Sequence, residues 1–322
     1  MKKDGVFVSG IARSKESGIL GVEKLSRMID ANTAEEAFRL LREYGFGKNA
    51  ETDSYTEYEK AIAEENAALH AFIREYSPSA SFTAYCFLKD DFHNAEVAVR
   101  SVFLGKEGVY KEDGLTKKSD ILAAAAGDSK KVPDYLAAPM KSAYESFNTG
   151  KATGAGIADI FIKGYYAAAL KLFKGDFLSF TVREIDCKNV SLAVRTDSEE
   201  IFRSQFIRGG KISAEKLLPI VGRDYEKAER DFAFTENQEL ISLALKEAGQ
   251  GKPLVMFERA AESYPLKKLS EKKYEPTGIV PLAMYYLYKV NEMKNVRIIM
   301  VGKLSGTGKE EIKARLKENY VG

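Results

Sequence analysis

Apolar residues along the chain recur mostly every three or four positions, the spacing that places them on one face of an α-helix. The segments 55–76, 157–173 and 281–301 show this pattern. Alternation of period two is rare, although it occurs at 178–182, and a β-branched run fills 296–301. We predict helices there as well, because both segments fall at corresponding places in a repeat. The pattern therefore predicts an all-α protein.

Capping residues and helix breakers set several predicted boundaries. Thr33 is a predicted N-cap, with Glu36 at the third helical position to complete a capping box. Pro265 is predicted to end a late helix, whereas Pro281 falls in the first turn of the last long helix, where proline is tolerated. Residues 1–17 are expected to form a short lead.

One polar pattern occurs three times: an acid, two variable residues, an asparagine, a small apolar residue and then an apolar run. The copies lie roughly a hundred residues apart. Their acids and asparagines are Asp91 and Asn94, Asp186 and Asn189, and Glu292 and Asn295. Arg100 and Arg195 follow six positions after the first two asparagines. The third copy has Val301 at that position and carries its base at Arg297.

A glycine followed by apolar and polar residues recurs at nearly the same interval, at Gly18, Gly114, Gly210 and Gly302. Self-similarity at a fixed period indicates a repeat architecture. We therefore predict three related helical units, each of ordinary domain size. Their predicted ranges are 1–104, 105–198 and 199–322, and the end of the chain is predicted to begin a fourth partial copy.

The acid and the asparagine of each motif share a helix face, because positions i and i+3 are neighbours. Beside an apolar stripe they can hydrogen-bond a neighbouring helix or a broken turn. A buried polar group can also fix the register of a helix. We interpret the three motifs as structural.

Composition narrows the class of protein further. The chain has 322 residues, 45% of them hydrophobic and 30% charged, as in soluble globular proteins. Its net charge of +2 gives no nucleic-acid footprint. No apolar run approaches the ~20 residues of a membrane span, and we expect no secretory signal, because the first residues have no apolar h-region. Two cysteines, Cys86 and Cys187, favour a reducing cytosol, and we expect both to be buried.

Two glycine-rich stretches resemble nucleotide-binding motifs, but neither matches its motif fully. The stretch 302–310 resembles a phosphate-binding loop, but its spacer is one residue too long and Glu310 stands where a hydroxyl should bind magnesium. The stretch 154–156 lacks the third glycine of a dinucleotide motif, since position 159 is Asp159.

The two histidines, His70 and His93, have no partners at metal-ligand spacing. For His93 we expect helix packing or hydrogen bonding. Cys86 and His93 lie two helical turns apart and cannot form a nucleophilic pair. We predict no catalytic, cofactor-binding or metal-binding residues, no cofactor, and no bound small-molecule substrate.

Several segments together carry a family resemblance. They are Asp-Asp-Phe-His-Asn at 90–94, Arg100, Lys106, Tyr-Leu-Tyr-Lys at 286–289, the block 292–299, and Gly302 with Lys303. With these residues the sequence resembles the C subunits of V-type (vacuolar and archaeal-type) ATPases and ATP synthases, whose eukaryotic counterparts are the d subunits. Asn291 and Met293 depart modestly from the pattern of the family. The resemblance covers essentially the whole chain.

The resemblance implies an all-helical funnel of three similar domains, related by a pseudo-threefold axis around a central pocket. It implies a non-catalytic rotor subunit that receives the central shaft, rests peripherally on the membrane proteolipid ring at its cytoplasmic side, and transmits torque for proton or sodium transport. Binding of nucleic acid is not expected. A helical-repeat scaffold for another protein is the alternative, since stacked repeats create concave binding surfaces. A nucleotide-using enzyme is a third possibility, resting on 302–310 alone.

Overall fold

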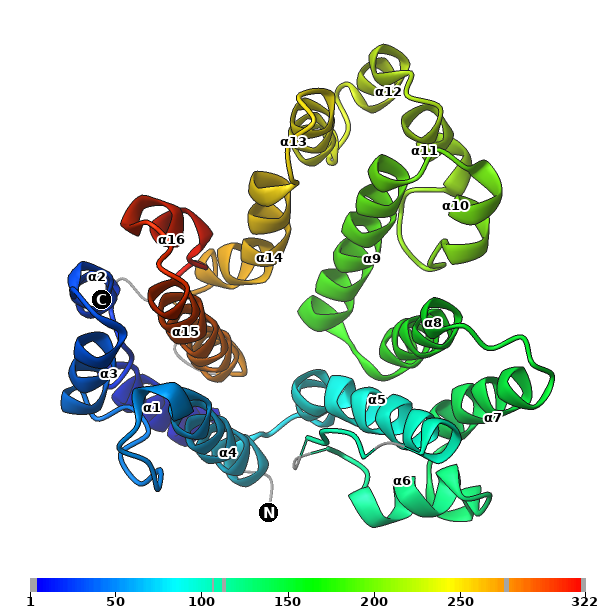
Figure 1. Ribbon diagram of the computed structural model, residues 1–322. Helices are drawn as coiled ribbons and strands as arrows, with labels where there is room; N and C mark the ends of the chain where they lie inside the picture. Colours follow the sequence, from blue (N-terminus) through cyan, green and yellow to red (C-terminus); the bar gives the residue numbers. More distant parts are fainter. Residues whose placement is uncertain (1–4, 106, 112–113, 275–277, 320–322) are drawn as a thin grey trace. The chain divides into compact units, whose positions relative to one another are not determined.

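The computed structural model describes residues 5–105, 107–111, 114–274 and 278–319, and these residues form helices without a β-strand (Figure 1). The predicted all-α class is confirmed. The first half contains α1 (Gly5–Glu16), α2 (Val22–Asp30), α3 (Ala34–Glu43), the 3₁₀ turn η1 (Tyr55–Glu57), α4 (Tyr58–Tyr76), α5 (Ala80–Leu104), α6 (Lys118–Ala125), η2 (Ser129–Lys131) and α7 (Asp134–Asn148). The second half contains α8 (Gly154–Leu172), α9 (Gly175–Arg195), α10 (Glu199–Gln205), α11 (Ala214–Val221), α12 (Tyr225–Phe232), α13 (Gln238–Gly249), α14 (Val255–Ser270), α15 (Val280–Leu304) and α16 (Lys309–Arg315).

The chain divides into two compact units. Unit 1 combines Met1–Ala80 with Glu262–Gly322, so it contains both ends of the chain. Unit 2 is Ser81–Ala261. Helix α14 begins in unit 2 and ends in unit 1. Among the described helices, none is long and apolar enough to cross a membrane.

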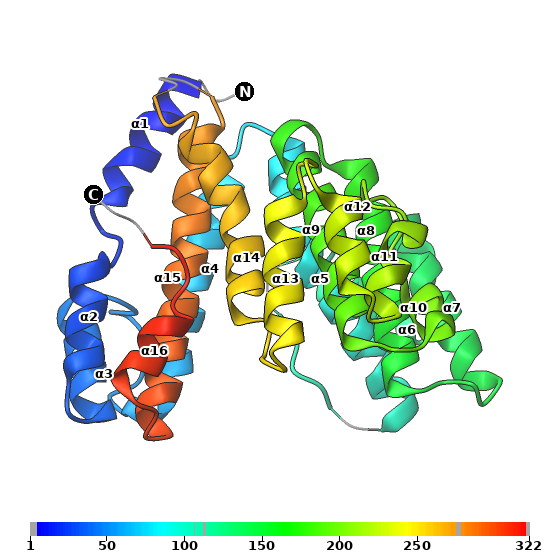
Figure 2. The same cartoon turned by 90° about the horizontal axis from the view of Figure 1, so that it is seen from above.

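Helix α15 is the central element of unit 1. It packs against α1, α2, α3, α4 and α16, and it lies beside α4 in both views (Figures 1 and 2). Its buried residues, which include the polar Lys289, Glu292 and Asn295, lie on several sides of the helix, as expected for a central helix. Its fully buried side chains include Leu282, Ala283, Val296, Ile299 and Met300.

Unit 2 is built around α8 and α9. Helix α8 packs on α7 and α9, and α9 also packs on α11 and α13. The core beside α9 contains Val190, Phe202, Leu217, Ile220, Phe232, Ile241, Ala244 and Phe257. Helices α5 and α8 approach closely at Gly164, where an added Cβ would lie 3.0 Å from the Phe92 ring and 3.1 Å from Pro139.

The helical predictions for the two uncertain segments are confirmed, because 178–182 lies within α9 and 296–301 within α15. The predicted cap at Thr33 is also confirmed. Its side chain accepts a hydrogen bond from the Glu36 N–H at 3.1 Å. The Glu36 carboxylate in turn accepts from the Asn32 N–H at 2.8 Å. Pro281 lies in the first turn of α15, as predicted.

Two local predictions are wrong. Residues 5–16, expected to form a short lead, form helix α1, because Val8 and Ala12 give this segment an apolar side that packs on α15. Pro265 lies inside α14, which continues to Ser270. Burial of Leu266 and Leu269 holds the last turn in place despite the hydrogen bond that proline removes.

Candidate functional site

The first acid–asparagine pair binds the backbone of the loop that follows its own helix. Asn94 on α5 donates from Nδ2 to the Lys111 carbonyl at 2.8 Å and accepts from the Lys111 N–H at 2.7 Å. Asp91, one turn earlier, accepts from the Thr116 N–H at 3.0 Å and from the Thr116 hydroxyl at 2.9 Å. We call such an arrangement, an acid and an asparagine one turn apart holding a loop backbone, a clamp.

The second clamp repeats this geometry on α9. Asn189 donates to the Ile207 carbonyl at 2.8 Å and accepts from the Ile207 N–H at 2.9 Å. Asp186 accepts from the Lys211 N–H at 3.2 Å and the Ile212 N–H at 2.9 Å. Both side chains are buried, as are those of the first clamp. The loops are therefore held by polar groups that water does not reach.

The third clamp uses both ends of the chain. Asn295 on α15 donates to the Lys317 carbonyl at 3.1 Å and accepts from the Lys317 N–H at 2.7 Å. Glu292 accepts from the Leu20 N–H at 2.5 Å. The Leu20 carbonyl accepts from Asn319 at 2.7 Å, which joins the two ends directly. The expectation that the motif bonds a broken turn is confirmed in all three copies.

The glycine series belongs to the same structure. A Cβ at Gly114 would lie 2.0 Å from the Asp91 Oδ1, and one at Gly210 would lie 2.2 Å from the Asp186 Oδ1. Only glycine lets the loop backbone approach these carboxylates. Gly18 takes the corresponding place before Leu20, but its nearest neighbour is the Lys15 carbonyl at 3.4 Å. The longer glutamate of the third clamp reaches the loop from farther away.

The fourth glycine has a different environment. Gly302 lies inside α15, where an added Cβ would be 2.6 Å from the Ile312 side chain of α16. The lysines of this stretch bind the end of α2. Lys303 donates to the Ala31 carbonyl at 2.5 Å, and Lys309 donates to the Asp30 carbonyl at 3.0 Å. Cations suit the last carbonyls of a helix, so both lysines have a structural role here.

The arginines of the three motifs join each motif helix to the start of another long helix. Arg100 on α5 donates to the Gly154 carbonyl, the first residue of α8, at 2.9 Å. Arg195 on α9 contacts Glu258 in the first turn of α14 at 2.5 Å.

Arg297 on α15 completes the set. It binds Glu59, in the first turn of α4, through two hydrogen bonds of 2.6 and 2.7 Å. The pairs α4–α5, α8–α9 and α14–α15 each consist of consecutive helices. Every arginine therefore reaches the helix that opens the next pair, and the third arginine reaches the helix that opens the first.

A buried ionic cluster surrounds the third clamp. Lys289 pairs with Glu292 and, at 2.7 Å, with Glu65 of α4, whose other oxygen accepts from the Gly47 N–H at 2.8 Å. Burial raises the pKa of Glu292, although Lys289 and the Leu20 N–H act in the opposite direction. Burial lowers the pKa of Lys289, but the Glu292 and Glu65 carboxylates outweigh it and hold that pKa above its usual value.

Carboxylates of the first two motifs also carry shifted pKa values. Burial raises the pKa of Asp90, beside the first clamp, to about 6, against opposing effects of Lys111 and His93. Burial also raises the pKa of Asp186, while the Ile212 and Lys211 N–H groups counteract it. Burial is the largest cause of both shifts, because it disfavours the charged form of a carboxylate.

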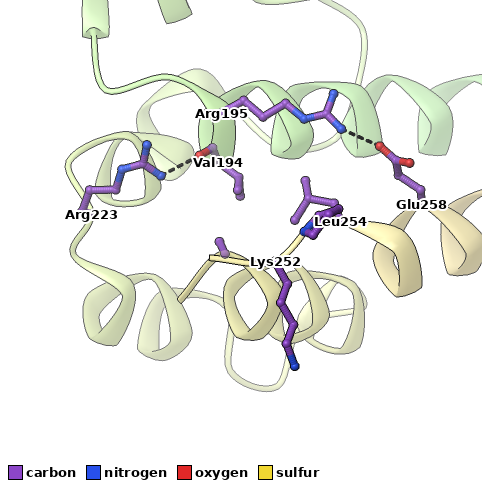
Figure 3. Close-up of a pocket in the computed structure, with 8 residues that line it drawn as sticks. Val194, Arg195, Arg223, Lys252, Leu254 and Glu258 are labelled. Atoms are coloured by element: carbon purple, nitrogen blue, oxygen red, sulfur yellow. Dashed lines mark hydrogen bonds and ion pairs between the residues drawn. The ribbon is translucent and has the colours of Figure 1, made fainter. Parts of the chain in front are cut away.

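A pocket of about 410 Å³ lies where the α9 end meets the start of α14 (Figure 3). Arg223, in left-handed conformation with φ of 61°, donates to the Val194 carbonyl at 2.6 Å and so caps α9. Arg195 points the other way, toward Glu258. The charged groups Arg195, Arg223 and Glu258 of this pocket are thus engaged in joining helices.

The remaining candidate residues are placed as follows. The His93 Nε2 lies 3.0 Å from the Val109 carbonyl, which confirms a hydrogen-bonding role. Both cysteines are buried, as predicted. Burial raises the pKa of Cys187 to about 12, which disfavours a reactive thiolate. Within the described part of the chain, no three His, Cys, Asp or Glu side chains are grouped to hold a metal ion. Lys106 lies outside the described residues.

The sequence does not reveal the partners of the clamps, although two of the missed contacts left a signal in it. It did not identify Leu20, whose contribution is a backbone N–H, nor the Arg297–Glu59 pair. The position of Gly18 in the glycine series was the available signal for the first. For the Arg297–Glu59 pair the signal was Arg297 itself. The third motif has Val301 where the other two have an arginine, and Arg297 is the base that it carries instead.

Comparison with known proteins agrees with the resemblance seen in the motifs. The sequence matches the family described as ATP synthase (C/AC39) subunit over residues 8–315. It is similar to the C subunit of the A-type ATP synthase of Methanocaldococcus jannaschii, with 24% identity over 96% of this chain and 85% of that protein. It is also similar to the C subunit of the V-type sodium ATPase of Enterococcus hirae, with 19% identity over 96% of this chain and 97% of that protein. The C subunit of the A-type ATP synthase of Halobacterium salinarum is 30% identical over 44% of this chain and 41% of that protein.

Proposed function

The chain belongs to the ATP synthase (C/AC39) subunit family, and we propose that it is the socket of a rotary ATPase rotor. In this role it receives the foot of the central shaft and rests on the membrane proteolipid ring. It passes torque between ion flow in the membrane and nucleotide chemistry elsewhere in the complex. It is a peripheral subunit on the cytoplasmic side and has no active site of its own.

The observation that carries this proposal is the threefold use of one clamp. A part that transmits torque must be stiff, and loops are ordinarily the most mobile segments of a protein. Here buried carboxylates and amides of α5, α9 and α15 hold the segments that follow α5, α10, α16 and α1 through hydrogen bonds, most of them to the backbone. The buried carboxylates and amides of the three motifs are thereby engaged in hydrogen bonds that stiffen the protein.

We further propose that the chain forms three similar domains, 1–104, 105–198 and 199–322, around a central pocket. Each of these ranges contains one of the three clamp helices α5, α9 and α15. The order of the arginine contacts supports a pseudo-threefold arrangement, since α5 contacts α8, α9 contacts α14, and α15 contacts α4. Three contacts of this kind, each from one clamp helix to the start of another helix, are compatible with a funnel of three domains.

The coupled ion is either a proton or sodium in this proposal. One relative is named as a subunit of an A-type ATP synthase and another as a subunit of a V-type sodium ATPase. The chain itself takes part in neither reaction chemically, so the same socket is compatible with both.

Co-purification tests the proposal. The purified chain is mixed separately with the purified shaft subunits and with the detergent-solubilised proteolipid ring, and bound material is analysed by native mass spectrometry. Stable binding to either partner, with one chain per complex, is the expected result. Absence of binding to both partners would contradict the socket role and favour a scaffold for another protein.

A further inference from the structure

Phe234, in the loop between α12 and α13 of unit 2, has a fully exposed side chain (100%). Its φ is 62°, in the left-handed region that a bulky residue seldom adopts. An aromatic ring left in water by a strained backbone contributes nothing evident to folding. Observed strain of this kind is a reason to look for function.

The loop around Phe234 is firmly held. The Phe234 N–H donates to the Gln238 side chain at 2.8 Å, and the Thr235 hydroxyl donates to the Phe232 carbonyl at 2.8 Å. The buried Asn237 accepts from Arg183 of α9, and Glu236 pairs with Lys211 at 2.8 Å. The loop therefore holds the Phe234 backbone in place, with the ring projecting into solvent. A phenylalanine side chain has only two rotatable bonds, so it loses little conformational freedom on binding, which suits an anchor residue.

The surroundings of Phe234 along the chain are acidic. Glu229, Asp231 and Glu239 lie within five residues of it and are exposed. Among the described residues, no ion pair involves any of these three carboxylates, whereas Glu236 is paired with Lys211 and Glu226 with Arg230. An apolar knob among uncompensated carboxylates is complementary to an apolar pocket bordered by Lys or Arg.

We propose that Phe234 is an anchor that inserts into an apolar pocket with a basic border on a neighbouring protein subunit of the rotary complex. This inference rests on the proposed function, because the complex supplies the partner. The proposed binding partner of Phe234 is a protein surface. A membrane surface, a second copy of this chain and permanent exposure to solvent are the rival outcomes.

Photo-crosslinking in the assembled complex tests the proposal. Phe234 is replaced by p-benzoylphenylalanine, assembly is checked by native mass spectrometry, and the crosslinked peptides are sequenced after illumination. Crosslinks to another protein of the complex, at a segment containing Lys or Arg, are expected. Crosslinks to lipid, to a second copy, within the chain or to nothing overturn the inference while leaving the socket role intact. Failure of the unsubstituted chain to assemble contradicts both.

A second measurement gives the strength of the contact. Phe234→Ala should weaken retention of the chain in the complex by at least about tenfold, as truncation of an interface anchor does. Ile201→Ala on α10 is the matched control, because Ile201 is an exposed apolar residue (49%) of the same unit. Equal retention of the two variants would overturn the proposal.

Two further variants separate binding from folding. Phe234→Asn removes the ring but suits a left-handed backbone, so the isolated chain should keep or raise its Tm while losing retention. A lowered Tm would assign the residue to folding instead. Glu229→Gln combined with Asp231→Asn should lower retention at low salt more than at high salt. Unchanged salt dependence would contradict a basic border.

Discussion

Glu292 and Leu20 lie 272 residues apart in sequence, yet the Glu292 carboxylate accepts the Leu20 N–H at 2.5 Å. In the other two clamps the acid binds a loop only 25 or 26 residues further on. The third clamp is thus completed by the beginning of the chain. Stability of unit 1 consequently depends on the contact between the segment around Leu20 and α15.

Replacement of Glu292 should destabilise unit 1 strongly. Glu292→Leu leaves the Leu20 N–H unpaired and removes one of the two carboxylates that neutralise buried Lys289. Breaking a buried pair in this way costs about 3–5 kcal/mol. Hydrogen exchange should accelerate in α1 and α15 and stay unchanged in α9. The control is Glu23→Leu at an exposed position. Uniform acceleration across both units would contradict this reading.

The second clamp should contribute about 2–4 kcal/mol to folding through Asn189. Asn189→Leu removes both hydrogen bonds to Ile207 and leaves that buried backbone N–H and carbonyl unsatisfied. Denaturant unfolding measures the loss of free energy. Asn148→Ala, at an exposed asparagine that ends α7, should change it by less than about 0.5 kcal/mol. Similar effects of the two substitutions would show that the clamp is not important for stability.

The sequence predicts the helices because their periodicity is strong, and it predicts the bonding of the motifs because an acid and an amide share a helix face. It does not identify the partners. Lys111, Ile207, Lys317 and Leu20 contribute backbone groups, which leave no mark on side-chain identity. Gly302 follows the period of the glycine series by sequence, but packing against Ile312 is its actual role.

Pro265 and α1 show a second limit of prediction from sequence, because tertiary packing determines the structure at both places. Proline disfavours a helix interior locally, but burial of Leu266 and Leu269 outweighs that preference in α14. The weak apolar pattern of residues 5–16 becomes a helix because α15 offers it a surface. Neither interaction can be read from a local stretch of sequence.

The two glycines of the series should respond differently to alanine. Gly210→Ala brings a Cβ to 2.2 Å from the Asp186 Oδ1, so the second clamp must open or shift, at about 1–3 kcal/mol. Gly18→Ala meets nothing nearer than 3.4 Å and should be nearly neutral. Thermal unfolding of the pair measures the difference. Equal changes in Tm for the two variants would contradict the close approach of Gly210 to the Asp186 carboxylate.

Asp90 should make stability fall as pH rises. Burial raises its folded-state pKa to about 6 from the ordinary value of 3.8. The folded state therefore binds the proton more tightly than the unfolded state between these values. The stabilisation is fully present below about pH 4 and is lost as pH rises through about 6.

Asp90→Asn removes this titration. We expect it to stabilise the protein by about 1–3 kcal/mol at pH 8 and to have little effect at about pH 3.5. Denaturant unfolding at both pH values provides the measurement, with the exposed Asp197→Asn as control. A gain of equal size at both pH values would assign the effect to packing instead of ionisation.

The central claim is that this chain couples the shaft to the ring, and the most direct measurement compares ATP hydrolysis with ion pumping. The complex is reconstituted into vesicles with and without the chain, and both rates are recorded. Without the chain we predict that hydrolysis continues while pumping is lost, and that adding the chain back restores pumping. Pumping at the full rate in its absence would contradict the socket role.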